Sequence, residues 1–172
     1  MTHLNNTYIV YCESLSVCLY STDTHRPLNV INVDGMNNPL DIVICRDDRQ
    51  LFIANWDFIT EERCIWRVSI DDQSCVNWLT TDEPFDCYTL SLTSRRLLVT
   101  SWEPARLHQY NSTDGQLQRV VLMPQYMRYL WHGVETTRGT FVVGHRGTPE
   151  DKEQDAVSEL FGFVSYQHVF QQ

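Results

Sequence analysis

The sequence predicts an all-β protein built from about four similar units of short strands. An eight-residue pattern with a polar start and an apolar middle occurs four times in the 172 residues, and its copies begin at Asn5, Arg49, Arg95 and Arg138. The starts are 44, 46 and 43 residues apart, and strand-favouring aromatic residues make up 12% of the chain. A period of about 40–50 residues made of short strands is typical of β-propeller blades.

The two middle units each read as four strands. The clearest alternation of apolar and polar residues runs from Cys64 to Ile70. Asp114-Gly115 lies between two apolar runs, and glycine tolerates the positive φ that hairpin turns require. The strands expected in these units cover residues 41–45, 51–56, 64–70 and 75–80, then 88–92, 97–102, 107–111 and 117–122.

The first and last units each read as three strands. No strand pattern precedes Tyr8. The expected strands cover residues 8–12, 17–21 and 28–33 at the start, and 133–136, 141–144 and about 159–166 at the end. A closed propeller completes one blade with a strand from the other terminus, so these ends predict an open or incomplete propeller of roughly 14 strands. Its exposed sheet edges favour self-association.

We expect one propeller domain over residues 1–172. Its units cover about 5–39, 40–84, 85–130 and 131–172.

Composition and charge limit the partners. The net charge of −9 disfavours nucleic acid and modestly favours a basic partner. No apolar stretch approaches the ~20 residues that span a bilayer, so we expect no membrane insertion. The first residues also lack the basic and apolar regions of a signal peptide, which makes a cytoplasmic location the default expectation.

The six cysteines leave their chemistry open. None belongs to a C-x-x-C motif, and several occupy apolar strand positions. Buried reduced thiols fit this pattern best, with structural disulfides or a metal site as alternatives. We expect no cofactor. The cysteines are Cys12, Cys18, Cys45, Cys64, Cys75 and Cys87.

Two stretches resemble the repeats of NHL-type propellers, which read Pro-x-Gly-Ile, then Leu-Tyr-Val-Ala-Asp, then Ile and Val. The first stretch is Pro39-Leu40-Asp41-Ile42 followed by residues 51–55 and 65–68, and the second combines residues 131–134 with 140–143. YVTN-like and lactonase-like propellers share this look. The resemblance extends over about residues 5–166.

The chain departs from that pattern at two places. Asp41 replaces the usual glycine of the first strand, and Asn55 or Ser101 replaces the aspartate that usually closes the second strand. The resemblance implies a radial scaffold whose loops and channel mouth bind other molecules, often proteins. It carries over no catalytic residue.

Trp56, Trp102 and His145 end the repeated pattern in successive units. Equivalent positions of a propeller form a ring around its axis, so these side chains could line one surface and anchor a partner. The alternative is that each tryptophan packs between neighbouring blades. His145 also begins a basic tip with Arg146 and Gly147, which could receive a carboxylate or phosphate or could be a plain surface turn.

His132 and Glu135 begin the fourth unit and are plausible metal ligands. Asp41 holds the equivalent place in the second unit, and Thr89 holds it in the third. One histidine and two carboxylates are few for a metal centre, so we predict no metal ligands. The acidic run at residues 150–155 suits a solvated loop or the binding of a basic partner.

These observations favour a non-enzymatic scaffold that binds a protein or peptide. The sequence contains no Gly-x-Ser-x-Gly and no G-x-x-x-x-G-K-[ST], so nucleophilic catalysis and phosphate binding lack support. Two alternatives stay open. One is a truncated propeller fragment without independent function, and the other is a metal-dependent, lactonase-like hydrolase.

Overall fold

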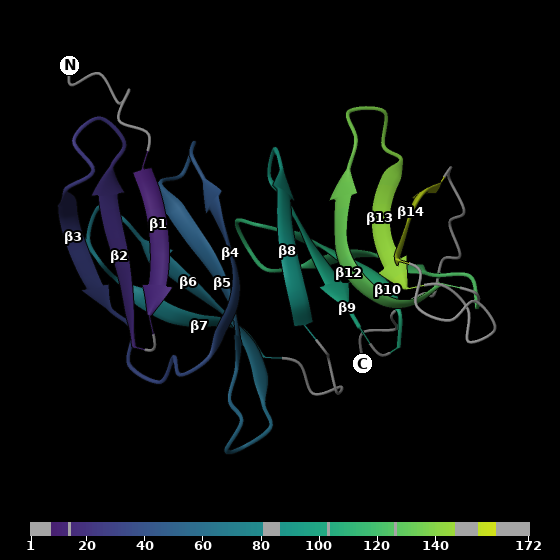
Figure 1. The fold of residues 1–172 in the computed structure, drawn as a ribbon, viewed down its shortest axis with the longest axis horizontal. Coiled ribbons are helices and arrows are strands. Elements are labelled where there is room, and N and C mark those ends of the chain that lie inside the picture. The colour runs from purple at the N-terminus through teal and green to yellow at the C-terminus, as the bar shows by residue number, and fades with distance from the viewer. Residues whose placement is uncertain are drawn as a thin grey trace.

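The computed structural model describes residues 8–13, 15–80, 87–102, 104–125, 127–146 and 155–160 and contains 14 strands there (Figure 1). The strands are β1 (Tyr8–Glu13), β2 (Ser16–Ser21), β3 (Pro27–Asn32), β4 (Pro39–Cys45), β5 (Gln50–Trp56), β6 (Arg63–Ser69), β7 (Cys75–Thr80), β8 (Cys87–Thr93), β9 (Arg96–Ser101), β10 (Arg106–Asn111), β11 (Leu117–Leu122), β12 (Arg128–Glu135), β13 (Phe141–Arg146) and β14 (Asp155–Leu160).

Consecutive strands pair in antiparallel fashion into four sheets, which we call blades 1 to 4. Blade 1 is β1-β2-β3, blade 2 is β4 to β7, blade 3 is β8 to β11, and blade 4 is β12-β13-β14. The predicted all-β class and the pattern of three, four, four and three strands are confirmed. The blades follow one another side by side, with β8 next to both β4 and β12, as in an open propeller (Figure 1).

Blade 4 differs from the expectation in its bounds. β12 begins at Arg128, five residues before the expected strand, so the unit boundary expected at 130/131 falls inside it. The reason is that its pairing with β13 shifts after Arg128 and again after Leu130, which breaks the two-residue alternation. β14 covers Asp155–Leu160, and the rest of the strand expected at 159–166 lies outside the described residues.

β1 corresponds to the second strand of the other blades. In blades 2 and 3, the first strand pairs with the second through a register shift, the second pairs with the third without a shift, and the third pairs with the fourth through a shift. The pairing β1–β2 has no shift and the pairing β2–β3 has one. β2 and β3 therefore match third and fourth strands. Among the described residues, blade 1 has no counterpart of the innermost strands β4, β8 and β12.

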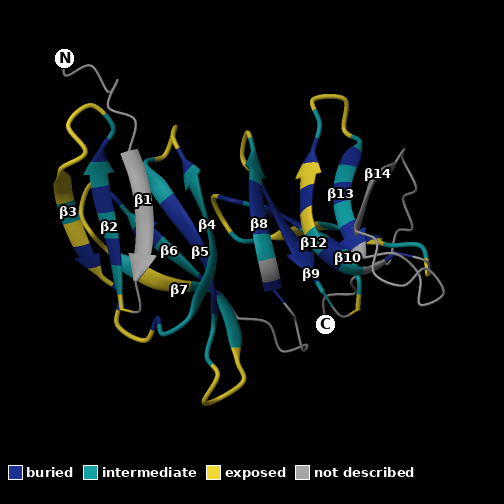
Figure 2. Cartoon of the chain, viewed as in Figure 1, coloured by how far each residue is buried: buried dark blue, intermediate teal, exposed yellow. Residues whose placement is uncertain are grey.

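The core lies between blades, in three seams (Figure 2). Neighbouring residues of β5 point to opposite seams, since Leu51 and Ile53 pack against blade 1 while Phe52 and Ala54 pack against blade 3. A central blade is thus buried on both faces, which explains why its second strand is a continuous apolar run.

The seams are three sets of buried residues. Seam 1/2 contains Val17, Leu19, Ile31, Val33, Met36, Leu51, Ile53, Val68 and Ile70. Seam 2/3 contains Cys45, Phe52, Ala54, Ile65, Cys87, Leu90, Leu97, Val99 and Tyr110. Seam 3/4 contains Leu98, Leu107, Val121, Met127, Leu130, Phe141 and Val143.

Among the described residues, no helix is long and apolar enough to cross a membrane. Cys45 is a buried thiol, and Cys18, Cys64 and Cys75 are half-buried thiols. The side chain of Cys12 lies outside the described residues.

Candidate functional site

β5 and β9 finish and β12 begins at one end of the molecule, the lower end of the view in Figure 1, and aromatic residues occupy these strand ends. Trp56 is the last residue of β5, and Trp102 directly follows β9. Tyr129 and Trp131 lie in the first half of β12. We call the surface formed by these four residues the aromatic face.

Trp102 joins blade 3 to blade 4 on this face. Its ring centroid lies 5.6 Å from that of Tyr129 at an interplanar angle of 86°, and 5.2 Å from that of Trp131 at 49°. Tyr129 and Trp131 lie at the two places where the pairing of β12 with β13 shifts. Tyr129 also has a left-handed backbone with φ 51°. The strand irregularity therefore directs two extra aromatic rings toward Trp102, which the sequence alone did not indicate.

Trp56 is held by a cation. The Arg63 guanidinium lies 5.1 Å from the centroid of the Trp56 ring, and Arg63 Nη1 donates a 3.4 Å hydrogen bond to the Cys87 carbonyl of blade 3. Beside it, the buried Asn55 accepts hydrogen bonds from the backbone N–H groups of Asn37 and Asn38 at 3.1 and 2.9 Å. These contacts fix the loop that leads into β4.

His145 does not occupy the place of Trp56 and Trp102. Matching the residues that face the preceding blade aligns Phe141 with Leu51 and Leu97, and so His145 with Asn55 and Ser101. The equivalence of His145 with the two tryptophans, which the sequence pattern predicts, therefore does not hold. A strand that is apolar on both faces shows no alternation of apolar and polar residues. The sequence pattern therefore places the fourth copy one residue out of alignment with the second and third copies.

The basic tip is only partly described. His145 is buried, with 4% of its surface exposed. Arg146 follows His145 and so corresponds in β13 to Trp56 in β5, but its side chain and Gly147 lie outside the described residues. Of the acidic run 150–155, only Asp155 is described, as the first residue of β14.

His132, Asp41 and Thr89 share one place on the innermost strands, because each follows an equivalent shift and pairs with Gly144, Ala54 and Thr100 respectively. His132 is exposed. Asp41 accepts hydrogen bonds from the backbone N–H groups of Leu90 and Ile42 at 2.7 and 2.8 Å, and so ties blade 2 to blade 3.

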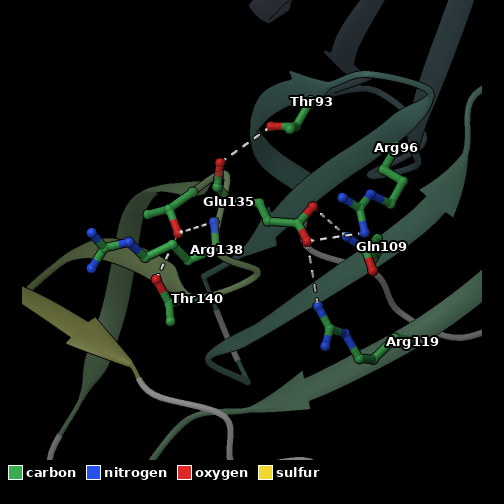
Figure 3. Close-up of polar contacts among 8 residues, drawn as sticks. Thr93, Arg96, Gln109, Arg119, Glu135, Arg138 and Thr140 are labelled. Atoms are coloured by element: carbon green, nitrogen blue, oxygen red, sulfur yellow. Dashed lines mark hydrogen bonds and ion pairs between the residues drawn. The ribbon is translucent and has the colours of Figure 1, made fainter.

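Glu135 points toward blade 3, where its carboxylate meets side chains of β9, β10 and β11 (Figure 3). With 2% of its side chain exposed, its carboxylate accepts a 2.8 Å hydrogen bond from Gln109 Nε2 and pairs with Arg96 at 3.2 Å and Arg119 at 3.9 Å. The Arg119 guanidinium also lies 4.6 Å from the centroid of the Phe141 ring. Within the described residues, no group of three or more His, Cys, Asp or Glu side chains is placed to hold a metal ion.

Two titratable groups of β10 face seam 2/3. Burial, helped by the charge of Arg106, lowers the pKa of His108 from its ordinary 6.5 to about 4. Burial raises the pKa of Tyr110, whose ring stacks on His108 with centroids 6.3 Å apart. Both groups are uncharged at neutral pH, which suits their apolar surroundings.

The four radial sheets and their shared seams define the class of the protein as a β-propeller. Among solved structures, it is similar to the β-propeller chain of "Crystal structure of Nidogen/Laminin Complex", with a TM-score of 0.66 at 15% identity. The match covers 84% of this chain and 53% of that chain, so the protein spans about half the length of this neighbour. No protein family and no curated protein matches the chain.

Proposed function

We propose that the protein is a non-enzymatic β-propeller scaffold that binds a protein or peptide at its aromatic face. The observation that carries the proposal is the gathering of Trp102, Tyr129 and Trp131 from two adjacent blades, with Trp56 at the same end of the next blade. Tryptophan and tyrosine are enriched among the residues that dominate binding energy.

Two further observations support this reading. The similar solved structure is, by its title, a complex of two proteins, and it shares the blade architecture. His132, the residue after Trp131 on β12, is exposed and can give a partner a polar contact. The finer assignment to the NHL type rests on residues 39–42, 51–55 and 65–68 and belongs to this proposal.

The test selects binders from a displayed library of random short peptides on the full chain and measures their Kd by fluorescence anisotropy. We expect Trp102→Ala to raise the Kd about tenfold or more, because a central aromatic anchor is lost. His132→Ala removes an exposed side chain, so it leaves the melting temperature unchanged while raising the Kd by a smaller factor.

Trp78→Ala is the matched control, because Trp78 lies on the outer strand β7 and packs on Phe52 with ring centroids 4.9 Å apart. The Trp78→Ala substitution should lower the melting temperature and leave the Kd for the selected peptides unchanged. If the selection yields no binder, or if every binder is as sensitive to Trp78→Ala as to Trp102→Ala, the aromatic face is not the binding surface.

A further inference from the structure

The loop between β5 and β6, residues 57–62, exposes two large apolar side chains next to each other. Phe58 is 59% exposed and Ile59 is 78% exposed. The loop forms the exposed tip of the hairpin that projects from the lower end of Figure 2. Other exposed apolar residues, such as Val76 on β7 and Leu117 on β11, stand singly on the outermost strands, which is ordinary for a protein surface.

The loop is ordered by its own hydrogen bonds. The Asp57 carboxylate accepts from the N–H groups of Ile59 and Thr60 at 2.8 and 3.2 Å, and the Asp57 N–H donates to the Glu62 carbonyl at 2.8 Å. These bonds, above all the one from Ile59, hold the pKa of Asp57 below its ordinary value. A loop ordered before binding loses less conformational entropy when a partner arrives.

The base of the loop is also anchored. Arg63, the first residue after it, stacks over the Trp56 ring and donates to the Cys87 carbonyl of blade 3. These contacts engage the guanidinium of Arg63, which follows the loop in the sequence. The loop itself presents the exposed carboxylates of Glu61 and Glu62 beside its apolar tip. The surface is therefore acidic and apolar together.

Resting on the proposed function, we infer that residues 57–62 are a docking loop for a basic, amphipathic segment of a protein partner. Phe58 and Ile59 bury against apolar side chains of that segment, while Glu61 and Glu62 pair with its lysine or arginine side chains. Charge complementarity argues for this occupant, because an acidic loop on a chain of net charge −9 repels acidic segments and anionic membranes.

The experiment uses two pools of short peptides with the same leucine and phenylalanine content, one containing lysine and arginine and the other aspartate and glutamate. Binding to the full chain is measured by fluorescence anisotropy at low and high salt. We expect the basic pool alone to bind, with a Kd that rises as salt is added. Phe58→Ser with Ile59→Ser should raise the Kd about tenfold.

Matched controls separate the loop from general effects. Val76→Ser removes an exposed apolar residue from outer strand β7 and should leave the Kd unchanged. Glu61→Gln with Glu62→Gln should raise the Kd about threefold and flatten its salt dependence, because rim charges contribute modestly and are screened. The charge-matched control, Asp23→Asn with Asp34→Asn, should do neither.

The outcomes distinguish this inference from the proposed function. If basic peptides bind and respond to Trp102→Ala but not to the Phe58 and Ile59 substitutions, the docking loop is wrong and the aromatic face stands. Equal binding of acidic peptides, binding to phosphatidylcholine vesicles through Ile59, or loop-dependent dimerisation in light scattering would each overturn the stated partner. Loss of all peptide binding, with no binder in the library selection, would remove the proposed function itself.

Discussion

Seams 2/3 and 3/4 join similar blades with different chemistry. Seam 2/3 has an apolar core. Its polar cross-links are single hydrogen bonds to backbone groups, such as the one that Asp41 accepts from the Leu90 N–H and the one that Arg63 donates to the Cys87 carbonyl. Seam 3/4 places the buried carboxylate of Glu135 between two arginines and a glutamine. The comparison shows that the repeat fixes where blades meet but leaves open whether contact is made by hydrocarbon or by charge.

The difference has an energetic meaning. Apolar contact stabilises a seam roughly in proportion to the area removed from water. A buried ion pair contributes little net stability relative to an apolar replacement, but the loss of one partner is costly. The loss of a single polar side chain should therefore cost more stability in seam 3/4 than in seam 2/3.

The largest expected effect is the introduction of a charge into an apolar seam. Val99→Asp, in seam 2/3, and Ile53→Asp, in seam 1/2, each bury an unpaired carboxylate and should leave the chain unfolded by circular dichroism. Val134→Asp, at a 36% exposed position of β12, is the matched control and should fold. Normal melting of both seam variants would contradict the strand register.

The next effect concerns the buried carboxylate of seam 3/4. Glu135→Ala removes the acceptor that Arg96, Arg119 and Gln109 share, and we expect it to lower the free energy of unfolding by about 3 kcal/mol in urea titration. Asp41→Asn retains an acceptor oxygen and should cost about 1 kcal/mol. Equal costs for the two substitutions would mean that the seams do not differ as described.

The third effect is a pH dependence that belongs to seam 2/3. Because the pKa of His108 is about 4 in the folded chain and ordinarily 6.5, the unfolded chain binds more protons between these values. The free energy of unfolding should therefore fall as the pH is lowered from about 6.5 to about 4, by about 2 kcal/mol from this residue.

His108→Gln should flatten that part of the pH profile, measured as the urea midpoint at several pH values. The Glu135→Ala variant should keep the wild-type slope between pH 6.5 and 4, since its substitution leaves His108 and seam 2/3 intact. An unchanged slope in His108→Gln would assign the acid sensitivity to another group.

The strands were predictable from the sequence because their period survives even where individual residues differ. The second strand of blade 2 and its turn to the third strand lie where the pattern of residues 49–70 placed them. The phase of β13 was not predictable, since a strand buried on both faces shows no alternation.

The contacts of Glu135 were equally out of reach, because Gln109 and Arg119 come from a neighbouring blade at a separation that no local pattern records. Tyr129 and Trp131 were missed for another reason, since they depend on strand irregularities. Trp56 and Trp102 were found because they recur at one place in the repeat, but the sequence did not reveal that one contacts a cation and the other two rings.

The two-sided burial of β5 and β9 makes the described part of the molecule behave as a one-dimensional array. Each blade interacts with its immediate neighbours, so its stability is an intrinsic contribution plus one interfacial contribution for each neighbour. Blades 2 and 3 each receive two such contributions from the described residues, through seams 1/2, 2/3 and 3/4. Within the described residues, local opening is therefore cheapest at blades 1 and 4, so the hairpin that carries Phe58 and Ile59 projects from one of the two firmest parts of this array.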